Sequence, residues 1–196
     1  MKQQHWYNSL IIVALLASLF SFTSAGDEAE AYYIYSDLFE HGIPSGFMGD
    51  KDGSSLKVDV ACKIEPYKGN SCARFTANNS ETWRGIHIQL LGAWNAALKS
   101  DAKLADLSAY DKLEFYARAE ETENGPYLLQ TIGVGGGGAP EDQVEDSYLE
   151  IGTQWKKFSI SLKGHDFKRV NTMLYLVLPV GTLYLDEIRF VKKINK

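Results

Sequence analysis

A stretch near the middle of the chain, Trp83-Arg-Gly-Ile-His-Ile-Gln-Leu, carries the side chains best suited to contact a ligand. With the two-residue period of a strand, its apolar side chains fall on one face, and His87 and Gln89 fall on the other. Trp83 precedes this polar face in the sequence, and Trp94 follows it. Such a surface suits a sugar, because the apolar face of a sugar ring stacks on aromatic rings while its hydroxyls need directed hydrogen-bond partners. The same pattern also fits a strand whose indoles belong to the core and whose polar side chains are solvated.

The candidate catalytic motifs do not support an enzyme. The glycine run at 133–138 matches GxGxxG, but Ala-Pro-Glu-Asp follows it where a dinucleotide site requires the start of a helix. A glycosidase needs two carboxylates across a cleft, whereas Asp186 and Glu187 are adjacent on one predicted strand and are expected to point apart. The histidines lack the spacing of a metal site. We therefore predict a protein that binds its ligand without altering it.

Short strands are predicted to position the polar stretch. Turn signals recur every ten or so residues and helical character is almost absent, which is typical of a single antiparallel β-sandwich. The segment 93–104 fits either a short helix or a loop over a sheet, and the glycine-rich segments 42–53 and 135–146 are predicted to be surface loops. The predicted strands cover residues 32–39, 56–62, 71–77, 85–90, 113–118, 127–134, 155–162, 173–178 and 182–191.

The N-terminus has the features of a secretory signal. Lys2 precedes an apolar run at 10–20, and Thr23-Ser-Ala matches a signal-peptidase site. We predict that residues 1–25 are cleaved, leaving residues 26–196 as one exported domain, extracellular or periplasmic. An uncleaved anchor is the alternative, although the run is shorter than the ~20 residues that a membrane span needs. The formal charge of −5 argues against nucleic acid and anionic lipid as partners.

The two cysteines of the chain, Cys62 and Cys72, flank a segment of turn-forming residues. The turn predicts that they face each other across a hairpin, and in an exported protein this favours a disulfide. Closing so short a loop contributes roughly 2 to 3 kcal/mol in the chain-entropy treatment. Two thiols without a nearby histidine do not indicate a metal site.

Several segments, in this order, resemble the galactose-binding-like jelly rolls that serve as non-catalytic carbohydrate-binding modules on secreted glycoside hydrolases. The resemblance implies an all-β jelly roll that binds a poly- or oligosaccharide as a monomer, on a concave sheet. An extracellular protein-interaction or adhesion module, and a small polysaccharide lyase or glycosidase, are the competing interpretations. The matching segments are residues 43–48, 62–72, 83–89, 106–108, 113–118, 155–162 and 183–190.

The resemblance also implies a ligand surface on the concave sheet. It would contain His87, Gln89, Tyr116 and Arg118, with the two indoles, Trp83 and Trp94, as stacking partners. His87 stands where an aromatic residue is frequent in such modules, which leaves the class of ligand open.

A structural calcium ion is the other implied feature, at the point where the first strand meets the last. It would be bound by Asp37 and Asp186 with backbone carbonyls, and by Asp50 or Asp52. A hard cation takes six to eight oxygen ligands, which carboxylates gathered at a sheet edge supply in part. The alternative is that Asp186 caps a turn or pairs with Arg189.

Overall fold

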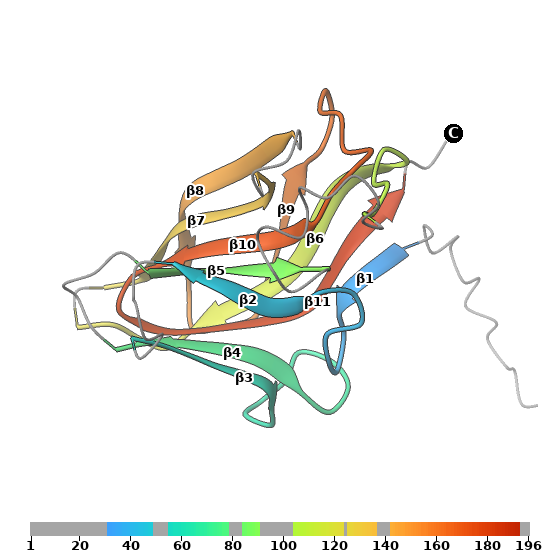
Figure 1. The fold of residues 1–196 in the computed structure, drawn as a ribbon. Helices are drawn as coiled ribbons and strands as arrows, with labels where there is room; N and C mark the ends of the chain where they lie inside the picture. The colour runs from blue at the N-terminus through green and yellow to red at the C-terminus, as the bar shows by residue number, and fades with distance from the viewer. Residues whose placement is uncertain are drawn as a thin grey trace, which may run out of the picture.

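A computed structural model describes residues 31–48, 55–78, 84–90, 104–123, 125–136 and 142–192. These residues form strands and turns without a helix, and the strands make two antiparallel sheets that pack face to face (Figure 1). The predicted all-β sandwich is therefore confirmed. The predicted signal at 1–25 and most of segment 93–104 lie outside the described residues. Within the described part of the chain, nothing helical is long and apolar enough to cross a bilayer.

The two sheets differ in their strand order. The six-stranded sheet has the order β3-β4-β11-β6-β9, with β1 beside β11, and the five-stranded sheet has the order β2-β5-β10-β7-β8. The six-stranded sheet contains β1 (Ala31–Tyr35), β3 (Leu56–Cys62), β4 (Cys72–Ala77), β6 (Tyr110–Ala119), β9 (Lys156–Ser161) and β11 (Gly181–Lys192). The five-stranded sheet contains β2 (Ile43–Met48), β5 (Arg84–Gln89), β7 (Tyr127–Gly135), β8 (Gln143–Ile151) and β10 (Thr172–Leu178).

Alternating side chains from both sheets fill the space between them. On β5, Ile86 and Ile88 point into this core, and on β10, Leu174 and Leu176 do the same. The intervening residues of each strand therefore face outward, away from the other sheet. This alternation fixes which side chains are available on the outer surface of each sheet.

The two edges of the five-stranded sheet differ from the sequence prediction. Residues 42–53 and 135–146 were predicted to be loops, but β2 begins within the first segment and β8 within the second. Both are edge strands. An edge strand tolerates Pro44 and a polar, glycine-flanked sequence, because one side of its backbone needs no partner in the sheet.

A β-bulge on β11 changes the direction of two carboxylates. The pairing of β11 with β6 shifts between Asp186 and Arg189, and Glu187 has a left-handed backbone with φ 48°. Both Asp186 and Glu187 contact Lys68, through its backbone N–H and its ammonium group respectively. The prediction that these two carboxylates point apart is wrong, because the extra residue of the bulge breaks the alternation.

Candidate functional site

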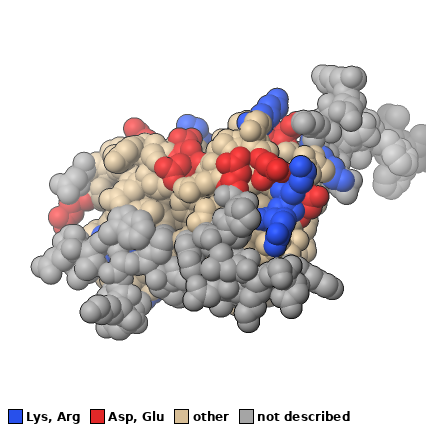
Figure 2. Space-filling model, turned by 45° about the horizontal axis from the view of Figure 1, so that its top comes forward, with Lys and Arg blue, Asp and Glu red and all other residues tan. Residues whose placement is uncertain are grey.

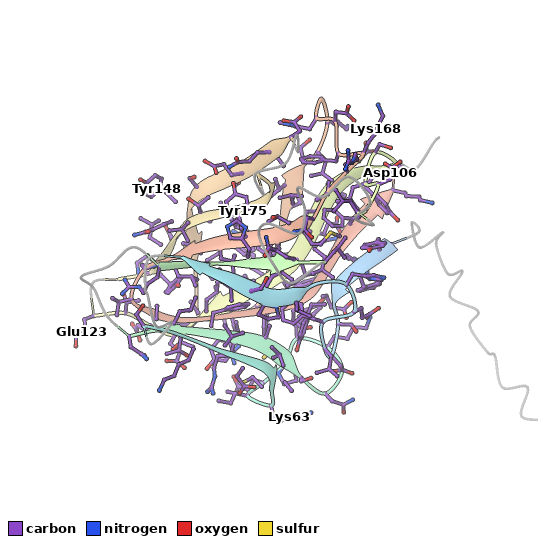
Figure 3. All side chains as sticks on the ribbon, viewed as in Figure 1. Lys63, Asp106, Glu123, Tyr148, Lys168 and Tyr175 are labelled. Carbon is purple, nitrogen blue, oxygen red and sulfur yellow. The ribbon has the colours of Figure 1, made fainter. Side chains whose placement is uncertain are left out.

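A single row of outward-facing residues crosses all five strands of the five-stranded sheet. The register pairs Glu145 with Gly133, Gly133 with Tyr175, Tyr175 with His87, and His87 with Ser45. Directly paired residues share one face of a sheet, so these side chains form one line across the strands. Figure 3 places Tyr175 over β10, in the middle of this sheet. We call this line the tyrosine row.

A hydrogen-bonded network occupies the β8 end of the tyrosine row. The Tyr175 hydroxyl donates to Glu145 Oε2 at 2.5 Å, and Gln143 Nε2 donates to the same hydroxyl at 2.7 Å. Burial raises the pKa of the Tyr175 phenol, so the hydroxyl keeps its proton and can donate. Gly133 leaves the space that the phenol fills, since a Cβ there would lie 2.5 Å from the Tyr175 hydroxyl oxygen. The network thus presents a carboxylate and an amide in fixed positions.

The β5 end of the row is buried. His87 stacks on Tyr175 with ring centroids 5.7 Å apart and is 5% exposed. Burial lowers the pKa of His87 to about 4, so its imidazole is neutral at pH 7. Gln89 is fully buried; its Oε1 accepts from Ser45 Oγ at 2.8 Å, while its Nε2 has no hydrogen-bond partner among the described residues. His87 and Gln89 face away from the core as predicted, but the prediction that they lie open to water is wrong.

A second row, of small side chains, runs beside the tyrosine row. The register pairs Ser147 with Thr131, Thr131 with Val177, and Val177 with Gly85. Each member lies two residues from its counterpart in the tyrosine row, so both rows face the same way. Gly85 and Val177 are buried, whereas Thr131 is half-buried and Ser147 is exposed. The two rows therefore become accessible toward β8.

The accessible end carries a ring and negative charge. Tyr148 is 71% exposed and has a left-handed backbone with φ 58°, and Figure 3 shows its ring beyond the edge of the sheet. Glu145, Asp146 and Glu150 are all exposed on β8. Figure 2 shows acidic side chains gathered over the upper middle of the molecule. The sequence predicts no ligand role for Tyr148 or Tyr175, because β10 reads as a continuous apolar run and β8 begins in a segment that reads as a loop.

The structure does not bring all the predicted ligand residues together. Tyr116 and Arg118 lie on β6, in the other sheet, so the two sheets separate them from His87 and Gln89. Their outer face is covered by the loop that joins β3 to β4. Tyr67 of this loop stacks on Tyr116 with centroids 3.6 Å apart, and Arg118 Nη2 donates to a loop carbonyl at 2.8 Å. Trp83 and Trp94 lie outside the described residues.

The two described carboxylates predicted to bind calcium already accept backbone N–H groups. Asp186 is fully buried and accepts three backbone N–H groups, and Asp37 accepts two. Within the described residues, no group of three or more His, Cys, Asp or Glu side chains is placed to hold a metal, and Asp50 and Asp52 lie outside them. Asp186 therefore caps a turn, which is the alternative role predicted for it, and the calcium ion itself stays a prediction.

Cys62 and Cys72 are directly paired across β3 and β4, as the hairpin prediction requires. Both are buried and both are free thiols in this structure. They pack against Tyr184 and Trp155 on the outer side of the six-stranded sheet. The disulfide itself stays a prediction.

Comparison with solved structures finds the same sandwich in carbohydrate-binding modules. A Family 30 module is 19% identical, with a TM-score of 0.56, over 85% of this chain and 90% of that chain. The Family 11 module of the cellulosomal cellulase Lic26A-Cel5E of Clostridium thermocellum is 12% identical, with a TM-score of 0.54, over 84% and 96% of the two chains. A Family 11 module of that organism, in complex with a β-1,3-1,4-mixed-linked tetrasaccharide, is 10% identical, with a TM-score of 0.50, over 89% and 94%.

These likenesses establish the fold, and they confirm the resemblance in architecture that the ordered segments indicated. The sequence itself matches no protein-family model and no curated protein.

Proposed function

We propose that this protein is a secreted, monomeric, non-catalytic module that binds a poly- or oligosaccharide on the outer face of its five-stranded sheet. The observation that carries the proposal is the β8 end of the tyrosine row, where β8 carries both the carboxylate and amide network and the ring of Tyr148, which is 71% exposed. Sugars need both kinds of contact, because their ring faces are apolar and their hydroxyls are polar. The fold shared with the carbohydrate-binding modules of Families 11 and 30 supports the same interpretation.

The sugar chain would lie across the strands, along the row of small side chains. Thr131 and Ser147 carry short side chains there, and the network of Tyr175, Gln143 and Glu145 lies in the neighbouring row. Hydroxyl and amide groups can both donate to sugar hydroxyls and accept from them, and a carboxylate can accept from them. A chain held in this way is contacted along its length, so we expect internal segments of a polysaccharide to bind and not chain ends alone.

The charge of the site selects against acidic polysaccharides. Glu145 lies in the network, and β8 also exposes Glu150, whose register partner Leu128 is exposed. His87 is neutral at pH 7 and cannot offset this charge. A uronic acid or sulfated sugar would meet like charge, which is unfavourable. We therefore expect the ligand to be neutral.

Catalysis is not part of the proposal. Glu145 is the one carboxylate in the described part of the tyrosine row, and its Oε2 already accepts from Tyr175. Hydrolysis of a glycosidic bond requires a second carboxylate roughly 5 to 9.5 Å away across the bound sugar. An assay for new reducing ends should therefore give no signal with any polysaccharide that the protein retains.

The test uses affinity electrophoresis through gels that contain mixed-linked β-1,3-1,4-glucan, xylan or a uronic-acid polymer. Wild type should be retarded by at least one neutral polysaccharide. Tyr148→Ala and Glu145→Ala should each weaken retardation about tenfold, the equivalent of 1.4 kcal/mol. Tyr67→Ala is the matched control, because Tyr67 is also an exposed tyrosine, 42% accessible, but on the opposite face. Equal losses in Tyr148→Ala and Tyr67→Ala would overturn the placement of the site.

The two tryptophans predicted to stack on the ligand are tested in the same gels. Trp83→Ala and Trp94→Ala should abolish retardation if the indoles flank the site as proposed. If both variants are retarded as strongly as wild type, the indoles do not contact the ligand. This result would not affect the proposal for the tyrosine row.

A protein partner is the second candidate function. Leu128 and Tyr148 expose apolar surface on neighbouring strands, β7 and β8, and exposed aromatic residues are enriched at the centres of protein interfaces. No retention on any polysaccharide, together with a native size larger than the monomer, would favour this candidate.

A further inference from the structure

The loop between β3 and β4 is bound at two points by carboxylates from distant parts of the chain. At the first point, Asp186 Oδ2 accepts the backbone N–H of Tyr67 at 2.9 Å and that of Lys68 at 3.2 Å. Its other oxygen, Oδ1, accepts the N–H of Glu187 at 2.7 Å. Asp186 is fully buried, so these N–H groups replace its hydration.

At the second point, Asp37 takes the corresponding role from the other side of the loop. Asp37 Oδ1 accepts the N–H of Asn70 at 2.5 Å and that of Ser71 at 2.9 Å. Gly69 has a left-handed φ of 65°, and a Cβ there would lie 2.5 Å from Asp37 Oδ1. Glycine is therefore required for the loop to close around this carboxylate. The Ser71 hydroxyl also donates to the Asp37 carbonyl oxygen.

Successive backbone N–H groups that converge on one point form a concave anion site, often called a nest. The loop contains two of them, one at residues 67 and 68 and one at residues 70 and 71, and each is filled by a carboxylate of the same chain. A calcium ion at either carboxylate would face the positive ends of these N–H dipoles. At Asp186 it would also have to compete with backbone N–H groups for both carboxylate oxygens.

The loop so held covers the part of the outer face of the six-stranded sheet that contains Tyr116 and Arg118. Trp155 Nε1 donates to Glu65 O at 2.9 Å, Arg118 Nη2 donates to Ile64 O at 2.8 Å, and Tyr67 stacks on Tyr116. The indole N–H of Trp155 and the guanidinium of Arg118 are therefore engaged by backbone carbonyls of the loop, while Tyr67 stays 42% exposed.

We propose that Asp37 and Asp186 form an internal double clamp that does the work of a structural metal, so that the fold of this protein does not depend on calcium. The clamp joins three parts of the chain: the segment after β1, which contains Asp37, the last strand, β11, which contains Asp186, and the β3–β4 loop. The calcium ion was predicted at this junction of the first and last strands. It acts independently of the proposed sugar binding, so either proposal can fail without the other.

The test measures thermal unfolding of the full chain after extensive chelation, with and without millimolar calcium. The clamp predicts the same melting temperature in both conditions, and no sensitised terbium luminescence at the neighbouring tyrosines. Asp186→Asn should lower the melting temperature by roughly 5 °C or more, because both Asp186 oxygens accept N–H groups and an amide nitrogen cannot accept one. Asp37→Asn should lower it less, because one amide oxygen can still accept both N–H groups and only the charge is lost. Asp106→Asn is the control, since its carboxylate caps only its own turn at Ser108.

A calcium-dependent rise in the melting temperature of wild type, lost in Asp37→Asn or Asp186→Asn, would overturn the proposal. Terbium luminescence that either variant abolishes would do the same. If both variants fail to fold, the wild-type comparison with and without calcium still decides the question.

Discussion

Removing one oxygen atom from the tyrosine row should weaken both the fold and the binding of sugar. In Tyr175→Phe the ring stays stacked beside His87, but the hydroxyl that joins Glu145 and Gln143 is lost. A hydrogen bond to a charged group contributes about 1.5 to 3 kcal/mol, and water can partly replace it at the exposed Glu145 carboxylate. We therefore expect a loss of about 1 to 2 kcal/mol in the free energy of unfolding. For a chain of this length, this lowers the melting temperature by roughly 2 to 8 °C.

The matched control for this variant lies on the opposite sheet. Tyr184 is also buried, and its hydroxyl donates to Glu120 Oε1 at 2.7 Å, so Tyr184→Phe removes the same kind of bond. Both variants should lose similar stability, measured by calorimetry. Titration calorimetry with a retained oligosaccharide should show about tenfold weaker binding for Tyr175→Phe and wild-type binding for Tyr184→Phe. Equal affinity in both variants would refute the role of the tyrosine row, whatever the change in stability.

Three further predictions follow from other parts of the structure. Because burial lowers the pKa of His87 from 6.5 to about 4, the unfolded chain binds a proton that the folded chain does not. The free energy of unfolding should therefore fall by up to about 3 kcal/mol as the pH drops from 6.5 to 4. Denaturant titrations should show a smaller fall in His87→Gln than in wild type. Equal falls would contradict the lowered pKa of His87. Gly133→Ala, whose Cβ would lie 2.5 Å from Val144 O, should destabilise the protein by about 1 to 3 kcal/mol, whereas Gly152→Ala, which meets open space, should not; similar melting curves for both would count against the packing described. If Cys62 and Cys72 oxidise after export, reduction should cost roughly 2 to 3 kcal/mol of stability, and mass spectrometry of the exported protein should show the loss of two hydrogens; two free thiols in that material would reject the disulfide.

The alternation of apolar and polar residues predicts correctly, for most strands, which side chains point into the core and which point outward. Ile86 and Ile88 lie in the core while His87 and Gln89 face outward, as a two-residue period requires. Alternation fails at Glu187, where a bulge inserts one residue into β11. A bulge of this kind is set by contacts with neighbouring strands and leaves no local signal in the sequence.

Sheet membership is the feature of the site that the sequence could not provide. β5 pairs with β2 and β10, whereas β6 pairs with β11 and β9, so the outward residues of β5 and β6 lie on opposite surfaces. These pairings join residues far apart in the sequence, and a period-two pattern is the same in either sheet. For this reason Tyr116 and Arg118 were grouped with His87, and Tyr175, on a strand that reads as wholly apolar, was overlooked.

The most direct test of the account is a two-dimensional amide NMR titration of the full chain with a mixed-linked β-1,3-1,4 tetrasaccharide, or with whichever neutral oligosaccharide the gels identify. The account predicts that the shift changes concentrate at Thr131, Glu145, Ser147 and Tyr175, on β7, β8 and β10 of the five-stranded sheet. Shift changes concentrated on the outer face of β4, β6 and β9 instead would contradict it.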